Sequence, residues 1–300
     1  MKIVLTGSLG HIGQPLTEKL ASSNHKLTVI SSSPDRAKAI TALGATPAIG
    51  DVQDAAFLAR TFAGADLVYC IVPPDYSVPD NNGYYRKVGE QYAAAIRSAG
   101  VPRVIHLSSF GAQLESGTGV ILGSHYVEEE LKALDGVELT IVRPTYFYYN
   151  LLNLIGSIRA TGKILTNYGG DDRLYLVAPS DIADAVVEEI ERPGEQRRVR
   201  YVYSDERTGH EIAAVLGRAI GKPDLEWQVI PDEAVRQAMI DHGMHPQMAD
   251  DLTDLNRSLR NGRLAEDFLR HKPERSGRVK LEDYAPTFAA AYAGKSNGHG

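Results

Sequence analysis

Three glycines near the start of the chain have a spacing that could support a specific chemistry. The apolar segment 2–5 leads directly into Gly7, Gly10 and Gly13, a G-x-x-G-x-x-G motif followed by an amphipathic helix pattern. At such a strand-to-helix turn, backbone N–H groups are free to bind a pyrophosphate. Gly7 permits the tight turn, Gly10 lets the phosphates approach, and Gly13 lets the helix pack close to the strand. A turn without a ligand is the alternative, but this context favours a dinucleotide, contacted by Gly7, Ser8, Leu9, Gly10, His11, Ile12 and Gly13.

The end of the second predicted strand indicates which dinucleotide is bound. Many NAD-binding sheets carry Asp or Glu there, which accepts hydrogen bonds from the ribose hydroxyls. This chain has Ser31 and Ser32 instead, with Arg36 one helical turn further on. Hydroxyls and a guanidinium can donate to a 2′-phosphate that a carboxylate would repel, so NADP is favoured and NAD stays open. The alternative is that the serines only cap a helix and Arg36 faces water.

Residues that follow the other predicted strands complete the expected cofactor site. Asp51 follows the third strand and would lie near the adenine, although an ordinary turn aspartate would look the same. The remaining expected contacts are Val72, Pro73, Ser109 and Tyr146.

These residues need a sheet to position them, and strand and helix signals alternate over about the first 145 residues. The predicted parallel strands are 2–5, 26–30, 46–49, 67–71, 103–107 and 139–143, and the helices between them include 54–62, 84–99 and 127–134. This alternation is typical of βαβ units and predicts an α/β, Rossmann-type, doubly wound parallel sheet. Its ligand should lie beyond the carboxyl ends of the strands.

The pattern changes after residue 145. We expect the sheet to be completed by segments at 174–177 and 199–203, with Ser180 capping the helix between them. A capping box from Thr208 to Glu211 starts another helix, and one short strand and several helices follow. The predicted domains are an NAD(P)-binding core at 1–150, a smaller, mainly helical lobe at 204–293 and a disordered tail at 294–300.

The composition limits the partners of the chain. Its 300 residues carry a formal net charge of −6, which argues against a general nucleic-acid or anionic-membrane partner. Cys70 is the one cysteine, so a disulfide framework is impossible, and its apolar surroundings indicate a buried thiol. An N-terminus that is itself a core strand predicts no signal peptide and a cytoplasmic protein. We expect no metal site.

Several segments together resemble the NmrA-like atypical short-chain dehydrogenase/reductases. The matching segments are 6–13, 50–51, 106–109, 143–150, 181–183 and 276–278, the last followed by a helix at 281–292. The Arg143-Pro-Thr-aromatic-Asn150 segment narrows the resemblance to this branch. The branch includes NAD(P)H-dependent quinone and azo-dye reductases and non-enzymatic NADPH-sensing regulators. The resemblance therefore implies hydride transfer to a small, electron-poor, quinone-like acceptor or, alternatively, a redox sensor with a protein partner; a homo-oligomer stays open.

The same resemblance suggests catalytic candidates. Catalytic short-chain dehydrogenases use a serine, together with a tyrosine and a lysine four residues later. Ser108 or Ser109 could be the serine and Tyr126 the tyrosine, but Glu130 stands in place of the lysine. A carboxylate there would disfavour the phenolate that proton exchange requires, so a sugar-nucleotide epimerase is disfavoured.

A quinone-like acceptor makes milder demands, because it is already electron-poor and needs mainly to be held over the nicotinamide. His125 is the candidate proton donor, and the aromatic run Tyr146, Tyr148 and Tyr149 is the candidate stacking wall. The alternatives are an exposed histidine at the start of a helix and tyrosines that fill the core.

Overall fold

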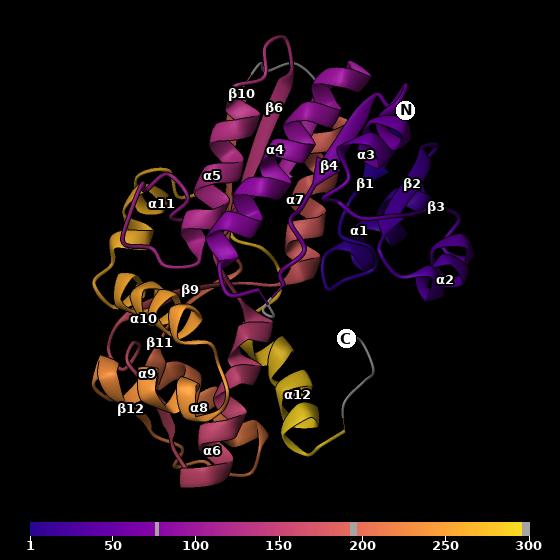
Figure 1. Ribbon diagram of the computed structural model, residues 1–300. Helices are drawn as coiled ribbons and strands as arrows, with labels where there is room; N and C mark the ends of the chain where they lie inside the picture. The colour runs from indigo at the N-terminus through magenta and orange to yellow at the C-terminus, as the bar shows by residue number, and fades with distance from the viewer. Residues whose placement is uncertain (76–77, 193–196, 296–300) are drawn as a thin grey trace.

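Parallel strands, flanked by helices, form the upper part of the molecule in Figure 1, and their order in the sheet is β10-β6-β5-β4-β1-β2-β3. The computed structural model describes residues 1–75, 78–192 and 197–295, and within these ranges the central sheet has seven strands. They are β1 (Lys2–Leu5), β2 (Lys26–Ser31), β3 (Thr46–Ile49), β4 (Leu67–Cys70), β5 (Arg103–Leu107), β6 (Glu138–Pro144) and β10 (Arg197–Val202). The six predicted strands are confirmed, and β10 completes the sheet at the expected segment 199–203.

Helices cover both faces of this sheet. One face packs against α1 (Gly13–Ala21), α2 (Ala37–Ala42) and α7 (Pro179–Glu191), and the other against α3 (Ala55–Phe62), α4 (Asn81–Ala99) and α5 (Ile121–Lys132). Every residue of β4 and β5 is buried, because both of their faces are covered. The predicted doubly wound α/β fold is confirmed.

Helix α5 begins at Ile121, six residues before the predicted start at 127. Gly123 resembles a helix breaker in the sequence, but here it allows a close helix contact. A Cβ at Gly123 would lie only 2.8 Å from the side chain of Tyr85 in α4. The predicted start of this helix was wrong because Gly123 is needed for the contact with α4, which the local sequence pattern does not reveal.

A second group of elements forms a lobe beneath the carboxyl ends of the strands (Figure 1). Its strands are β7 (Tyr146–Phe147), β8 (Ile164–Thr166), β9 (Arg173–Val177), β11 (Asp205–Thr208) and β12 (Trp227–Val229). Its helices are η2 (Tyr148–Leu154), α6 (Ile155–Thr161), α8 (Gly209–Ala219), α9 (Asp232–Asp241), α10 (Pro246–Arg260), η3 (Arg263–Ala265), α11 (Glu266–Arg270) and α12 (Leu281–Tyr292). The predicted capping box at Thr208 is present and starts α8.

Two expectations about this region are wrong. The segment 174–177 does not complete the central sheet, because β9 pairs with β7 and β11 in a separate three-stranded sheet. The edge of β6 is instead occupied by β10. Ser180 does not cap α7 either, since that helix begins at Pro179 and Ala178 precedes it.

The core of the lobe shows which segments belong to it. Buried residues of η2 and β9, such as Tyr148 and Leu174, share one apolar cluster with Ile212, Phe268 and Phe288. The lobe therefore includes chain from both before and after β10. Of the predicted tail 294–300, residues 296–300 lie outside the described part. Among the described residues no helix is long and apolar enough to cross a membrane.

Candidate functional site

The glycine loop follows β1 and leads into α1, and its three glycines serve different purposes. Gly7 has a φ of 87°, and a Cβ there would lie 2.3 Å from Ile71. A Cβ at Gly13 would lie 2.1 Å from the carbonyl oxygen of Ser8. A Cβ at the exposed Gly10 would meet only the Gly7 carbonyl, at 3.5 Å. The fold itself therefore requires Gly7 and Gly13, whereas Gly10 leaves open space in front of the loop.

The loop also has hydrogen-bond donors to offer. Within the described chain, the backbone amides of Leu9, Gly10, His11 and Ile12 donate to no protein acceptor. The Ser8 amide, in contrast, donates to the Ile30 carbonyl at 3.0 Å. Amides at the N-terminus of a helix, together with the positive end of its dipole, bind anions. This geometry fits the pyrophosphate of a dinucleotide.

Backbone strain is concentrated in the same loop. Ser8 has a φ of 53°, and it is the one non-glycine residue with positive φ in the described chain. Its hydroxyl donates to the Ser31 hydroxyl at 3.0 Å, which ties the loop to the end of β2. Strained residues persist where surrounding contacts hold them, and they cluster at ligand sites.

The loop lies at the point where the strand order reverses. β1 stands between β2 and β4, so the crevice expected in a doubly wound sheet opens at the carboxyl ends of β1 and β4. Val72 and Pro73 follow β4 there; Val72 is buried, and the Pro73 carbonyl accepts a hydrogen bond from Tyr84 at 3.0 Å. The structure thus brings these two residues to the same edge of the sheet as the glycine loop.

The residues predicted to choose between NADP and NAD lie at the end of β2. Ser31 is buried, and its hydroxyl oxygen also accepts from the Ser33 amide at 3.2 Å. Ser32 is exposed, and the partly buried Arg36 lies in the short helix η1 (Pro34–Arg36). Asp51 accepts from the Gln53 amide at 2.8 Å, the contact of an ordinary aspartate turn. Of the residues predicted to choose the cofactor, Ser32 is therefore exposed, Arg36 is partly exposed, and Ser31 is buried.

Ser108 is part of a buried ionic network rather than a free hydroxyl. It donates to Glu128 at 2.6 Å, and Glu128 also accepts from Arg143 Nε at 2.9 Å and Nη2 at 2.6 Å. Glu128 is 0% exposed. Burial raises the pKa of Glu128, but the Arg143 guanidinium and the Ser108 hydroxyl outweigh it and hold that pKa below its ordinary value.

Sequence reasoning missed this network. Arg143 continues it into the lobe, because its Nη1 also donates to the Tyr201 hydroxyl at 3.0 Å and lies 3.4 Å from Asp267. The available signal was the position of Glu128 on the same helix face as Val127 and Leu131, which are both buried. A charged residue on an apolar helix face needs a buried partner.

His106 is a second buried polar residue beside this network. Its Nδ1 lies 3.1 Å from the Cys70 carbonyl, and its Nε2 has no hydrogen-bond partner in the described chain. Burial lowers the pKa of His106 to about 4, so the ring is neutral at pH 7. Cys70 is fully buried, as predicted, and burial raises the pKa of its thiol.

His125 and Tyr126 are neighbours on α5, but their side chains have different surroundings. His125 Nδ1 lies 3.0 Å from the Ala112 carbonyl, in the segment that follows β5. The alternative of an exposed residue at the start of the helix is therefore wrong, because His125 is partly buried and lies inside α5. The Tyr126 ring lies beneath Arg86 of α4, whose Cζ is 3.8 Å from the ring centroid. Ser109, also partly buried, donates to the Phe110 carbonyl at 3.1 Å.

The aromatic run after β6 divides between the crevice and the core. Tyr149 stacks on His11 of the glycine loop, with centroids 4.5 Å apart, and on Phe147, at 4.9 Å. Tyr148 is fully buried and donates to the Val279 carbonyl at 3.1 Å, so it fills the core instead of forming a stacking wall. The Tyr146 hydroxyl lies 2.9 Å from that of Tyr168, and burial raises the Tyr146 pKa. Sequence reasoning missed the stack on His11, because nothing local connects these two positions.

The described residues include no group of three or more His, Cys, Asp or Glu side chains that could hold a metal ion. The groups that could hold a ligand are instead backbone amides, hydroxyls and rings around the glycine loop.

Comparison with known proteins finds a matching family and two related enzymes. The sequence profile of the NmrA-like family matches residues 1–261. The chain is 26% identical over 255 residues to an NAD(P)H azoreductase of Xenophilus azovorans, covering 84% of this chain and 85% of that protein. It is 24% identical over 268 residues to quinone oxidoreductase 2 of Escherichia coli (strain K12), covering 88% of this chain and 90% of that protein.

Solved structures share the fold. An NADPH-dependent quinone oxidoreductase from Escherichia coli complexed with NADPH superposes with a TM-score of 0.79 at 23% identity, covering 95% of this chain and 99% of the other. A triphenylmethane reductase from Citrobacter sp. complexed with NADP(H) gives 0.78 at 20% identity, covering 96% and 100%. A UDP-glucose 4-epimerase from Bifidobacterium longum gives 0.67 at 15% identity, covering 98% and 99%.

Proposed function

Since the chain belongs to the NmrA-like family, we propose that it is an NAD(P)H-dependent oxidoreductase that passes hydride to a small, electron-poor, quinone-like acceptor. The observation that carries this proposal is the glycine loop, whose four amides without acceptors lie at the switch point of the sheet. The azoreductase and quinone oxidoreductase relatives, matched over 84% and 88% of this chain, support an acceptor of this class.

NADP is the preferred form of the cofactor in this proposal. The end of β2 offers the Ser32 hydroxyl and the Arg36 guanidinium, and no carboxylate stands at the strand end. A planar guanidinium and a hydroxyl suit a 2′-phosphate, which carries negative charge and accepts hydrogen bonds. Two of the solved structures with this fold hold NADPH or NADP(H), which supports the same preference.

In this proposal, residues of the chain bind the cofactor, orient the acceptor and supply a proton to it. The nicotinamide supplies the hydride when it is bound, and reduction of a quinone to a hydroquinone also consumes a proton. The amides of Leu9 to Ile12 would hold the pyrophosphate, and the ring of Tyr149, which stacks on His11 and on Phe147, would lie beside it. His125 Nδ1–H donates to the Ala112 carbonyl, so Nε2 is the ring atom left to pass a proton to the acceptor, and water is the other source.

A non-catalytic NADP(H)-binding sensor is the second candidate, and a specific observation favours it. The Ser108 hydroxyl is committed to Glu128, and Tyr126 lies beneath Arg86 with Glu130 four residues further on. The described residues at these positions therefore do not form the serine–tyrosine–lysine arrangement that exchanges a proton with an alcohol or carbonyl. The same observation argues against sugar-nucleotide epimerase chemistry.

Steady-state oxidation of NADPH with a panel of quinones and azo dyes tests the proposal. We expect turnover in the wild type, most of the rate in Tyr126→Phe, and none in Ser109→Trp, which would fill the crevice beside the nicotinamide. Ser23→Trp, at an exposed serine after α1, is the matched control and should keep the rate. A loss of about a thousand-fold in Tyr126→Phe, about 4 kcal/mol of barrier, would make Tyr126 an essential acid. Firm NADPH binding without turnover of any acceptor would favour the sensor.

A further inference from the structure

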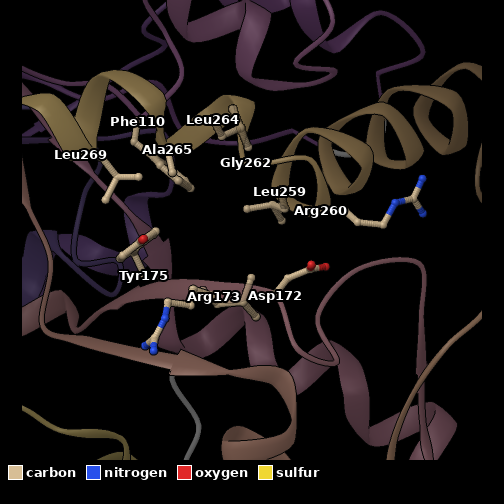
Figure 2. Close-up of a pocket in the computed structure, with 11 residues that line it drawn as sticks. Phe110, Asp172, Arg173, Tyr175, Leu259, Arg260, Gly262, Leu264, Ala265 and Leu269 are labelled. Carbon is tan, nitrogen blue, oxygen red and sulfur yellow. The ribbon is translucent and has the colours of Figure 1, made fainter.

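A cavity of about 160 Å³ lies in the lobe, between β9 and the segment formed by α10, η3 and α11 (Figure 2). None of its lining residues belongs to the expected cofactor or catalytic set. Four aliphatic side chains form much of its wall, and each is at most 9% exposed: Leu174, Leu259, Leu264 and Ala265. Two aromatic rings, those of Phe110 and Tyr175, complete this wall and are 5% and 8% exposed.

The cavity is also open to solvent on one side. Leu269 lines it and is 49% exposed, so a small molecule could enter beside this side chain. Figure 2 shows Leu269 at the same end of the cavity as Phe110 and Ala265. An exposed leucine beside a preformed hollow is an apolar surface whose burial by a ligand would be favourable.

The charged residues at the edge of the cavity turn their charges away from it. The Arg173 guanidinium donates to Glu206 at 3.2 Å, and that of Arg260 donates to Asp232 and to the Asn167 carbonyl, each at 2.7 Å. Figure 2 shows both guanidinium groups pointing outward. Asp172 is the remaining charged residue of the lining, and burial raises its pKa. The two lining guanidinium groups thus turn away from the cavity, and the Lys272 ammonium, 5.4 Å from the Tyr175 ring centroid, is paired with Glu206. The wall between them is mostly hydrocarbon and ring surface.

We propose that this cavity is a binding site for one uncharged aromatic ring. An engineered cavity of roughly 150 Å³ lined by Leu, Ile and Phe in another protein stays dry and binds benzene, which sets the size and chemistry of the occupant. The rings of Phe110 and Tyr175 can meet a bound ring face to edge, an arrangement that aromatic pairs favour. The site does not depend on the proposed oxidoreductase function, because it shares no residue with the glycine loop.

Toluene, with benzoate as its charged counterpart, tests this site in the full chain without cofactor. We expect toluene to bind the wild type in ligand-detected NMR and to raise its melting temperature, because binding to the folded state alone stabilises it. Benzoate should bind at least ten-fold more weakly, because its carboxylate would be buried beside Asp172, while Arg173, Arg260 and Lys272 are already paired with other carboxylates.

Two variants that fill the cavity, Ala265→Leu and Leu259→Phe, should each weaken toluene binding at least ten-fold. Ala219→Leu, at an exposed alanine of α8 outside the cavity, is the matched control and should bind like the wild type. Two independent filling variants keep the test valid if one of them fails to fold, which circular dichroism would reveal. NADPH titration of the same proteins should be unchanged within two-fold, which separates this site from the proposed function. Equal toluene binding in a folded filling variant, or tighter binding of benzoate than of toluene, would overturn the proposal.

Discussion

Substitution of Gly10 by valine separates cofactor binding from folding, because the structure assigns this glycine no packing role. A Cβ at this position would meet only the Gly7 carbonyl, at the ordinary contact distance of 3.5 Å. The fold should therefore tolerate Gly10→Val, whereas the branched side chain would stand where the phosphates must approach the amides of Leu9 to Ile12. We expect a folded protein that binds NADPH poorly.

The size of the effect follows from the hydrogen bonds that are lost. A hydrogen bond from a backbone amide to a charged phosphate contributes about 1.5–3 kcal/mol. Four amides of the loop have no acceptor within the described chain, and a displaced pyrophosphate would lose at least two of them. The loss of about 3–6 kcal/mol corresponds to an affinity roughly a hundred-fold to ten-thousand-fold weaker.

Calorimetric titration of NADPH, together with thermal unfolding, measures both quantities. Gly156→Val is the matched control, because no atom lies within 4 Å of a Cβ at this position in α6, far from the loop in sequence. Gly13→Ala should fail differently and lower the melting temperature, since its Cβ would lie 2.1 Å from the Ser8 carbonyl. If folded Gly10→Val binds NADPH as tightly as the wild type does, the loop does not hold the pyrophosphate and our reasoning is refuted.

Three further predictions concern cofactor choice and the buried polar residues. Calorimetry should show that the wild type binds NADPH about ten- to a hundred-fold more tightly than NADH, which corresponds to one charged contact of about 1.5–3 kcal/mol. Arg36→Ala should lose most of this preference, and equal affinities of the wild type for the two cofactors would contradict the prediction. In urea unfolding, Glu128→Leu should cost about 3–5 kcal/mol, because it removes the buried partner of Arg143 at 2.6 Å and leaves this guanidinium only the more distant Asp267. Adding Arg143→Met should restore part of that loss, so purely additive losses would contradict the pairing. The pKa of His106 in the folded protein, about 4, lies below its ordinary value of about 6.5, so the unfolded chain binds this proton at a higher pH than the folded chain does. The free energy of unfolding should therefore fall by up to about 3 kcal/mol as the pH drops from 6.5 to 4. His106→Asn should remove this pH dependence, and an unchanged pH profile in the variant would count against the prediction.

Local patterning was sufficient to predict most of the Rossmann core. Continuous apolar runs predicted the buried strands, and turn residues predicted where they end, as Gly100 shows by closing α4 with a φ of 64°. Asp54 accepts hydrogen bonds from the amides of Ala56 and Phe57 and so begins α3 close to the predicted position. These features depend on neighbours within a few residues, so they can be predicted from the sequence alone.

The same holds for part of the candidate site. The order of strand, glycines and helix placed the loop at the sheet edge, and the structure adds that Gly7 and Gly13 are required by close approach. The absent carboxylate after β2 can be read in the sequence alone. Which of the hydroxyls there is exposed could not be predicted, because Ser31 is buried by its contact with Ser8, a residue of another strand-to-helix turn.

The sequence by itself therefore determined the parallel α/β core, the glycine loop and the family. Only the tertiary structure decided that β9 leaves the central sheet, that Ser108 is committed to the Glu128–Arg143 pair, and that Tyr149 stacks on His11. The physical reason is the range of the interactions. Strand and helix formation follow the spacing of neighbouring residues, whereas strand partners, buried ion pairs and ring stacks join residues that only the folded chain brings into contact.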